Sequence, residues 1–533
     1  MRGRRFVFGL IAVSQVALVG ADVAGPGTAA FTSLSIDEPL VDGHSGGTFR
    51  LVSPEPISID PSNTANGYEM QVTSYLFTGL VTVAPNGAVS RGVATDWTKD
   101  AGCVRWTFHL ARGTRFHNGE EVTSRSFKRG WKRAASGRVA WLLKGIDTVD
   151  ATDPYTLRVA LVPGDCEFLQ RMIHPVFSPV PSNAGPAGND NYNDRPIGNG
   201  PFRMGGPWRH NSHIRLVRYD GYRLGRKASL AAVDIATSIN PAADSYRAFR
   251  SGKADWAQLP KPGLPSPRPG DVLVPTTVAT VSYLLPAVTT KPLDSAPARK
   301  AISLAIDRAA IARETFAYQP TPATSLVPPP VRRSSASALC GACRFDPAEA
   351  RRLAKIAGLT RGTVVHFRYA DRARHEKWTS AIKRQLESTL GITVNYYNLP
   401  FAALLENEVA PGVSGITLSG WGMDYPSPGD ALATLLSTRE IGTLDPAEPA
   451  TGGNAGRYSN PRVDRLLDQA RLTANKQARE IVYERAERIA IGADLAVIPL
   501  FYHRDYRLAA GDRFVNLRTD WSGNADLAAI SLR

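Results

Sequence analysis

Val364-Val365-His366-Phe367 is a short run of β-branched and aromatic residues, and it predicts a strand. Apolar residues at helical spacing follow over 378–390, and Ile392-Thr393-Val394-Asn395-Tyr396 then predicts a second strand. A strand, a helix and a strand in this order are typical of a lobe in which helices cover a largely parallel sheet. We therefore expect an α/β fold for this part of the chain.

The length of the chain extends this expectation to two lobes. Its 533 residues exceed what one core holds, because single hydrophobic cores stop growing near ~250–300 residues. Prolines are dense over 260–269, and a proline-rich stretch of this kind predicts a crossing from one lobe to the other.

The composition is that of a globular protein with a basic surface. Apolar residues make up 43% and charged residues 21% of the chain, and 63 Lys and Arg against 48 Asp and Glu give a net charge of +15. This charge suits anionic surroundings. The basic residues are scattered without a run of five, and no zinc-finger or RNA-binding motif is present, so we expect no nucleic-acid partner.

The N-terminus has the pattern of an export signal. Met1-Arg2-Gly3-Arg4-Arg5 is basic, and residues 6–20 are mostly apolar. This apolar run is shorter than the ~20 residues that cross a bilayer. We expect a signal peptide or signal anchor over 1–30 and a flexible tail over 31–45.

Four cysteines fit an exported chain, where an even number predicts disulfides. Three pairings are open, and we favour Cys103 with Cys166 and Cys340 with Cys343. The second pair also has the spacing of redox enzymes, but no thioredoxin-like βαβ context surrounds it. No further Cys or His pair completes four ligands, so we predict structural disulfides and no metal site.

One segment carries candidate binding chemistry: Gly420-Trp421-Gly422-Met423-Asp424-Tyr425-Pro426. It predicts a strand end that turns beside a carboxylate. Gly420 and Gly422 leave the backbone open, Trp421 offers a rigid wall, and Asp424 offers a negative charge. An extended ligand with a cationic end would fit such a segment. The alternative is that Trp421 is a core residue before an ordinary Asp-Tyr-Pro turn.

Motifs for catalysis are weak. Gly43-His44-Ser45-Gly46-Gly47 fits the nucleophile-elbow pattern, but a polar tail precedes it and a predicted strand follows, so a secreted hydrolase using Ser45 is a minor alternative. Gly252-Lys253 is followed by Ala254, which excludes a phosphate-binding Gly-Lys-Ser/Thr loop there. We expect no enzyme activity and no cofactor.

The most specific pattern runs from an alternating strand into a helix. It consists of Trp106-Thr107-Phe108-His109-Leu110, Gly113-Thr114-Arg115-Phe116-His117-Asn118-Gly119-Glu120, and Val122-Thr123 before Phe127 and Trp131. Other segments flank it in a fixed order: Gly47-Thr48-Phe49-Arg50-Leu51, Ile59-Asp60-Pro61, Leu76-Phe77-Thr78-Gly79-Leu80, Gly198-Asn199-Gly200-Pro201-Phe202, Arg299-Lys300-Ala301-Ile302, Ile306-Asp307-Arg308, Phe345-Asp346-Pro347-Ala348-Glu349-Ala350, Tyr458-Ser459-Asn460, Val463-Asp464 and Ile498-Pro499-Leu500. With the segment around Trp421 they resemble the extracellular solute-binding proteins of peptide ABC transporters, the dipeptide- and oligopeptide-binding proteins of family 5.

This resemblance implies a two-lobe α/β fold of the periplasmic-binding-protein type II, with an extra subdomain inserted in lobe one. The lobes would close on a ligand between them. The implied ranges are 46–82 and 196–272 for lobe one, 83–195 for the inserted subdomain, 273–503 for lobe two, and 504–533 for the return to lobe one.

The resemblance also implies how the ligand binds. A peptide lies extended and adds a strand, so its main chain does the pairing. One edge would be Ala65-Asn66-Gly67 and the other Gly420-Trp421-Gly422, and Asp424 would receive the peptide ammonium. Arg368 and Arg372 are candidates by position for the peptide carboxylate.

The implied partners are a peptide and the permease subunits of an ABC transporter, and we expect a monomer. The location would be periplasmic or at the cell surface, although the signal region lacks a lipobox cysteine. The chain also has Ala287 where the family usually has an Asn, so local contacts there are in doubt. A second hypothesis keeps the fold and changes the cargo to a nickel chelate, an oligosaccharide or an opine-like solute.

Overall fold

The computed structural model of the protein describes residues 40–188, 190–259, 268–315, 320–332, 339–371, 373–400, 403–404, 412–442 and 453–533. Grouped by their contacts, the residues divide into two units. Unit 1 contains Ala279–Met423 and Ser427–Arg504, and unit 2 contains the described part of Val23–Val278 with Asp424–Pro426 and Asp505–Arg533. The predicted lobe and subdomain ranges stay a prediction, and most of the predicted proline-rich crossing lies outside the described residues.

Unit 1 is built on one mixed sheet. Its strands are β12 (Asp271–Pro286), β13 (Thr321–Pro322), β14 (Val364–Ala370), β15 (Thr393–Leu399), β16 (Ile416–Gly422) and β17 (Ile498–Ala510), of which β12 and β17 continue into unit 2. The order is β17-β12-β16-β14-β15. β14 and β15 run parallel, and α9 (Ala373–Leu390) connects them, which confirms the predicted strand–helix–strand unit.

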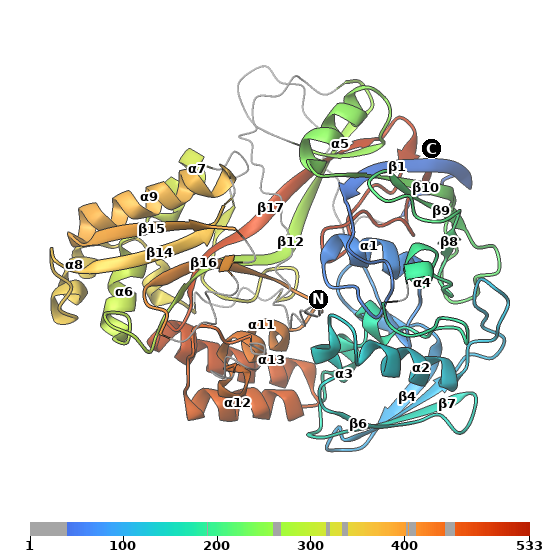
Figure 1. The fold of residues 1–533 in the computed structure, drawn as a ribbon, viewed down its shortest axis with the longest axis horizontal. Helices are drawn as coiled ribbons and strands as arrows, with labels where there is room; N and C mark the ends of the chain where they lie inside the picture. The colour runs from blue at the N-terminus through green and yellow to red at the C-terminus, as the bar shows by residue number, and fades with distance from the viewer. Residues whose placement is uncertain are drawn as a thin grey trace, which may run out of the picture. The chain divides into compact units, whose positions relative to one another are not determined.

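The helices of unit 1 form two groups that can be followed in Figure 1. The first contains α6 (Ala296–Leu304), α7 (Arg308–Thr315), the 3-10 turn η3 (Gly341–Cys343), α8 (Pro347–Ile356) and α9. The second contains α11 (Pro428–Leu436), the turn η4 (Thr438–Glu440), α12 (Pro461–Leu472), α13 (Lys476–Glu487) and the π-helix η5 (Arg488–Ala493). In the second group α12 and α13 pack side by side.

Caps decide where these helices begin. Asp346 before Pro347 is the sequence pattern of a helix start, and in the structure Asp346 accepts the N–H of Glu349 at 3.0 Å and starts α8. The sequence pattern over 297–316 reads as one helix, but the structure has two, α6 and α7. The reason is local: Asp307 accepts the N–H of Ala310 at 2.8 Å and so caps a second helix, and the buried Arg308 donates to carbonyls that the break exposes.

Unit 2 contains two four-stranded sheets. The first has the order β1-β10-β9-β8, with β1 (Gly46–Pro54) parallel to β10 (Leu230–Ser238), and then β9 (His213–Arg218) and β8 (Phe202–Met204). The second has the order β4-β5-β7-β6, formed by β4 (Ala94–Lys99), β5 (Arg105–Leu110), β7 (Thr156–Leu161) and β6 (Ile146–Asp150). Smaller elements complete the unit: α1 (Gly67–Leu76), β2 (Val81–Val83), β3 (Val89–Arg91), α2 (Ser124–Ala134), η1 (Ala140–Leu143), α3 (Phe168–Arg171), η2 (Pro175–Phe177), α4 (Asp190–Asp194), α5 (Pro241–Arg250), β11 (Trp256–Gln258), β18 (Phe514–Val515) and β19 (Ser531–Leu532).

The second sheet of unit 2 has a core of its own. Trp106, Phe108, Phe127 and Phe168 lie in one buried apolar cluster that extends from Leu80 to Phe177 in the sequence. The alternating pattern around Trp106 predicted this strand because every second residue faces that core. The sequence pattern over 97–110 suits β-structure throughout, but a turn between β4 and β5 divides this segment into two strands.

Both predicted disulfides are formed. Cys103 pairs with Cys166 and Cys340 with Cys343, with Cα–Cα distances of 5.1 and 5.3 Å. The first joins the turn before β5 to the segment after β7, and the second closes η3. In the part of the chain that the structure describes, no helix has the length and apolar character needed to cross a membrane.

Candidate functional site

Strand β16 is paired along its whole length on one side and only at its start on the other. Its antiparallel partner β12 pairs from Pro286 with Ile416 to Thr280 with Gly422. The parallel partner β14 pairs only with Ile416 and Thr417. Beyond Thr417, no described residue forms a ladder on that second side. The last five residues of β16 therefore present an edge that is open to strand pairing, although four of the five are buried.

The alternation of an antiparallel ladder tells which backbone groups face this edge. The N–H of Ala287 donates to the carbonyl of Gly415 at 2.9 Å, and the N–H of Met423 donates to the carbonyl of Ala279 at 2.9 Å. These two bonds show that the backbone N–H and C=O groups of the odd-numbered residues of β16 point toward β12. The N–H and C=O groups of Gly420 and Gly422 therefore point to the open edge, as do those of Leu418.

Gly420 and Gly422 leave the end of one face of the strand without side chains. Trp421 points to the opposite face, where it is 1% exposed and its Nε1 donates to Asp430 of α11 at 2.9 Å. Its side chain is thus a core residue, which is the alternative reading of the sequence. The buried indole therefore offers no exposed wall to a ligand in this structure. The predicted use of the main chain at Gly420 and Gly422 stays a prediction.

Small polar side chains lie on the glycine face. Ser282 of β12 stands opposite Gly420, and Thr280 stands opposite Gly422. The Oγ of Ser282 lies 2.7 Å from Nε2 of His503 on β17, and all three side chains are buried. A polar face beside an open strand edge suits a ligand that brings hydrogen-bonding groups of its own.

This polar face could not be assembled from the sequence, because Ser282 and His503 are 221 residues apart. One sequence signal was available: His503, Asp505 and Arg507 occupy every second position of β17, with the exposed Arg504 between the first two. Burial raises the pKa of Asp505 to about 6, against the opposing effect of Arg507, which lies 2.5 Å away. Alternating polar residues on a buried strand are worth singling out for this reason.

Asp424 follows β16 after one residue and is 5% exposed. By its contacts the segment Asp424–Pro426 belongs to unit 2, and Tyr425 packs against the apolar cluster around Trp106. The acid therefore does not face bulk solvent. A carboxylate held out of water favours a hydrogen-bonded or cationic partner over hydration.

The segment Ala65-Asn66-Gly67 is a helix start and not a strand edge. The N–H of Ala65 donates to Glu69 at 2.7 Å, and the side chain of Asn66 caps α1 by accepting the N–H of Glu69 at 3.0 Å. The carbonyl of Gly67 accepts from Asn524 at 3.1 Å. Several backbone groups that a ligand would need are thus engaged within unit 2, which corrects the expected strand geometry of this segment.

Of the two predicted arginines, Arg368 lies on β14 and is half-buried. Its Nη1 donates to the carbonyl of Ser414, and its guanidinium lies 5.5 Å from the ring centre of Tyr397. Burial lowers the pKa of Arg368. These contacts tie Arg368 to its own sheet, and Arg372 lies outside the described residues.

Ser45 does not form a nucleophile elbow. It is exposed and lies directly before β1, so a strand follows it where the elbow needs a helix. Within the described residues, no group of three or more His, Cys, Asp or Glu side chains is arranged to hold a metal ion.

Comparisons with known proteins place this geometry in a family. The profile described as "Bacterial extracellular solute-binding proteins, family 5 Middle" matches residues 88–443. The periplasmic oligopeptide-binding protein OppA of Salmonella typhimurium is 26% identical over 93% of this chain and 94% of its own length. The probable deoxycholate-binding periplasmic protein YgiS of Escherichia coli is 25% identical over 84% of this chain and 86% of its own.

A solved structure shows the same fold. Clavulanic acid biosynthesis oligopeptide binding protein 2 superimposes with a TM-score of 0.81 at 19% identity, over 97% of this chain and 99% of that chain. This likeness covers both units and confirms the predicted fold class.

Proposed function

Since the chain belongs to the bacterial extracellular solute-binding proteins of family 5, we propose that it captures peptides and delivers them to the permease of an ABC transporter. The similarity to the oligopeptide-binding protein of Salmonella typhimurium supports a peptide as the cargo. The role is that of a receptor, with binding and release and no chemical turnover.

The open edge of β16 is the observation that carries this proposal. A peptide in extended form can add to the edge as a strand, with its amides paired to Gly420 and Gly422. Pairing of this kind uses groups that every residue has. Binding should therefore tolerate many peptide sequences.

Asp424 supplies the charge that a main-chain edge lacks. It lies two residues beyond Gly422 in the sequence, and we assign the ammonium of the bound peptide to it. A hydrogen bond to a charged group contributes ~1.5–3 kcal/mol, or about ten- to a hundredfold in affinity. This contribution would favour peptides with a free amino terminus.

The other predicted contacts carry less of the proposal. For Ala65, Asn66 and Gly67, the backbone groups that are not engaged in the start of α1 stay candidates. Arg368 would have to leave Ser414 to meet a peptide carboxylate. Arg372 stays a candidate by position. Position between the lobes, a monomeric state and attachment at the cell surface stay predictions.

Calorimetry with a free-amine tripeptide tests the proposal. The wild-type protein should bind it, and Asp424→Asn should weaken binding by about ten- to a hundredfold. The same peptide with an acetylated amino terminus is the matched control, since it should bind both proteins weakly and alike. Absence of heat with a mixed peptide library would overturn the proposal.

A second cargo follows from the similarity to the deoxycholate-binding relative. Deoxycholate has no chain of amides and no cationic end, so its binding should not depend on Asp424 or on the edge of β16. Mass spectrometry of small molecules that co-purify with the protein separates the two cargoes directly.

A further inference from the structure

Helix α2 lines a groove of ≈ 480 Å³ that lies entirely within unit 2. One wall is the face of α2 that carries Arg125, Lys128, Arg129, Lys132 and Arg133. Gly185, Pro186 and Ala187 form the other wall, and Ser136 also lines the groove. None of the described residues that line the groove is a carboxylate.

Two of the five cations are already neutralised. Arg133 is 6% exposed and pairs with the buried carboxylate of Asp60. Arg129 lies 3.2 Å from Glu120 and also donates to the carbonyl of Val180. Both are therefore part of the frame of the groove and contribute little net charge to it.

The remaining three cations are exposed and uncompensated. Arg125, Lys128 and Lys132 make no hydrogen bond or ion pair with any described residue. They follow one another along one face of α2, over about 10 Å at 1.5 Å per residue. Like charges this close on a helix repel one another, so their arrangement is stabilised when an anion lies among them.

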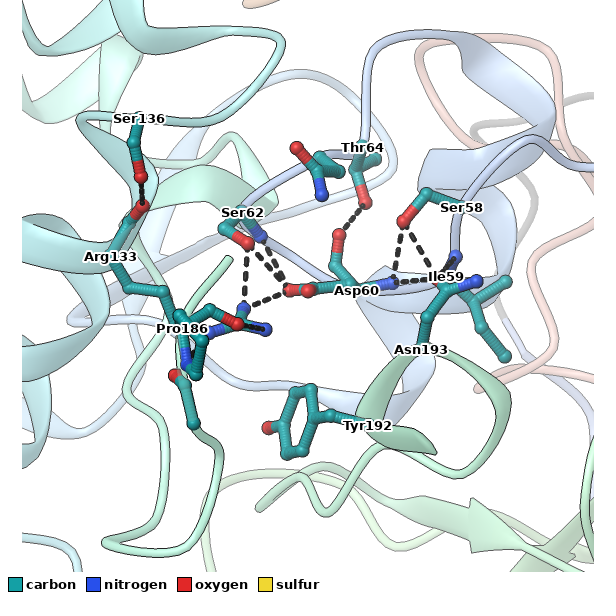
Figure 2. Close-up of polar contacts among 12 residues, drawn as sticks. Ser58, Ile59, Asp60, Ser62, Thr64, Arg133, Ser136, Pro186, Tyr192 and Asn193 are labelled. Atoms are coloured by element: carbon teal, nitrogen blue, oxygen red, sulfur yellow. Dashed lines mark hydrogen bonds and ion pairs between the residues drawn. The ribbon is translucent and has the colours of Figure 1, made fainter. Parts of the chain in front are cut away.

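The opposite wall is held in place by Arg133, as Figure 2 shows. Its Nε donates to the carbonyl of Gly185 at 2.9 Å and its Nη2 to that of Pro186 at 3.0 Å. These carbonyls would repel an anion, and the guanidinium engages them. Arg133 also donates to Ser62 at 2.6 Å and lies 4.8 Å from the ring centre of Tyr192. The groove is thus fixed by a buried network before any ligand arrives.

We propose that this α2 groove binds a soluble anion that carries two or more phosphate groups. A phosphate group offers several acceptor oxygens and up to two negative charges, and it suits arginine and lysine donors. The row of three cations is about 10 Å long, which is longer than a single phosphate group. A chain of phosphates can therefore contact all three cations. A concave groove of this volume fits a discrete ligand better than a flat bilayer surface.

Calorimetry with inorganic tripolyphosphate tests the proposal. The wild-type protein should bind it more tightly than orthophosphate, and raising salt from about 0.1 M to 1 M should weaken binding, because the Debye length shrinks from ~10 to ~3 Å. The variant Arg125→Gln/Lys128→Gln/Lys132→Gln should bind tripolyphosphate about tenfold or more weakly. Its thermal unfolding should match the wild type, since all three side chains are exposed.

A matched variant controls for net charge. Arg351→Gln/Lys355→Gln/Arg485→Gln removes the same three charges from exposed positions on α8 and α13, and tripolyphosphate affinity should change by less than about twofold. Equal weakening in both variants would overturn the proposal, because only net charge would then matter. It would also be overturned if tripolyphosphate did not bind, or if vesicles of phosphatidylglycerol bound through the three cations and tripolyphosphate did not.

Discussion

The open edge of β16 and the α2 groove are opposite solutions to binding. The edge offers neutral backbone groups, a glycine face and one buried acid, so it suits an extended chain with a cationic end. The groove offers side-chain cations over a buried ion pair, so it suits an anion. Main-chain pairing tolerates many ligand sequences, whereas side-chain charge selects ligands by their sign and is screened by salt.

The two regions also use aspartate differently. Asp60 is matched by Arg133 inside unit 2 and holds the frame of the groove, as the contacts in Figure 2 show. Asp424 is also buried, and it follows β16 after one residue. Both carboxylates are buried, so burial alone does not reveal the role of either one. The backbone and the partners around each carboxylate distinguish the two roles.

The largest expected effect is a loss of folding stability when the buried pair of Arg133 and Asp60 is broken. Arg133→Met leaves Asp60 buried without its counter-charge, and such a loss destabilises a protein by about 3–5 kcal/mol. Urea unfolding measures this loss. Arg129→Met is the control, because Arg129 and Glu120 are partly exposed and their pair contributes about 1 kcal/mol or less. If both variants lose the same unfolding free energy, the buried pair of Arg133 does not stabilise the fold more than the partly exposed pair of Arg129.

The next effect concerns pH and the buried Asp505 of β17. Burial raises the pKa of Asp505 from 3.8 to about 6, so the folded protein binds a proton more tightly than the unfolded chain does. Stability should therefore fall as pH rises from about 4 to 6. Asp505→Asn should flatten the dependence of the unfolding free energy on pH. The pKa of Asp520 is also raised to about 6 by burial, so part of the slope should remain.

An unchanged slope in Asp505→Asn would show that Asp505 titrates normally. The polar face next to Ser282 and His503 would then be wetter than the structure indicates.

The smallest effect tests the edge itself. Gly420→Pro removes an N–H that points away from β12 and places a ring on the open edge. Loss of one peptide hydrogen bond weakens binding by ~0.5–1.5 kcal/mol, plus any steric clash with the ligand. Gly420→Ala is the control: its Cβ would lie 3.2 Å from the carbonyl of Val281, but the N–H remains. Calorimetry with a tripeptide should separate the two variants.

If both variants bind the peptide equally well, the open edge is not used. Ser419→Pro sharpens the comparison, because the ladder places the N–H of Ser419 toward β12. Ser419→Pro should therefore lower the unfolding free energy, whereas Gly420→Pro should leave it nearly unchanged.

Local signals in the sequence predicted much of the fold. The N-cap Asp346, the alternating strand around Trp106 and the strand–helix–strand unit before residue 400 each depend on neighbours within a few turns of chain. Both disulfides could be assigned because few pairings were open. These features need no knowledge of distant contacts.

The site was only partly predictable. The segment from Gly420 to Asp424 could be singled out, but where the pairing with β14 ends depends on register between distant strands. The burial of Trp421 depends on Asp430 in a helix that packs below it. The contact between Ser282 and His503, and the pair of Asp60 with Arg133, join residues far apart in the sequence. Periodicity along the chain does not report such contacts.

Amide hydrogen exchange at β16 tests the central claim most directly. The N–H groups of Gly420 and Gly422 should exchange quickly in the free protein and slow markedly when a tripeptide binds. The N–H of Trp421, which faces β12, should be protected in both states and serves as the internal reference. If the peptide binds while exchange at Gly420 and Gly422 stays unchanged, the peptide does not pair with this edge and the account is wrong.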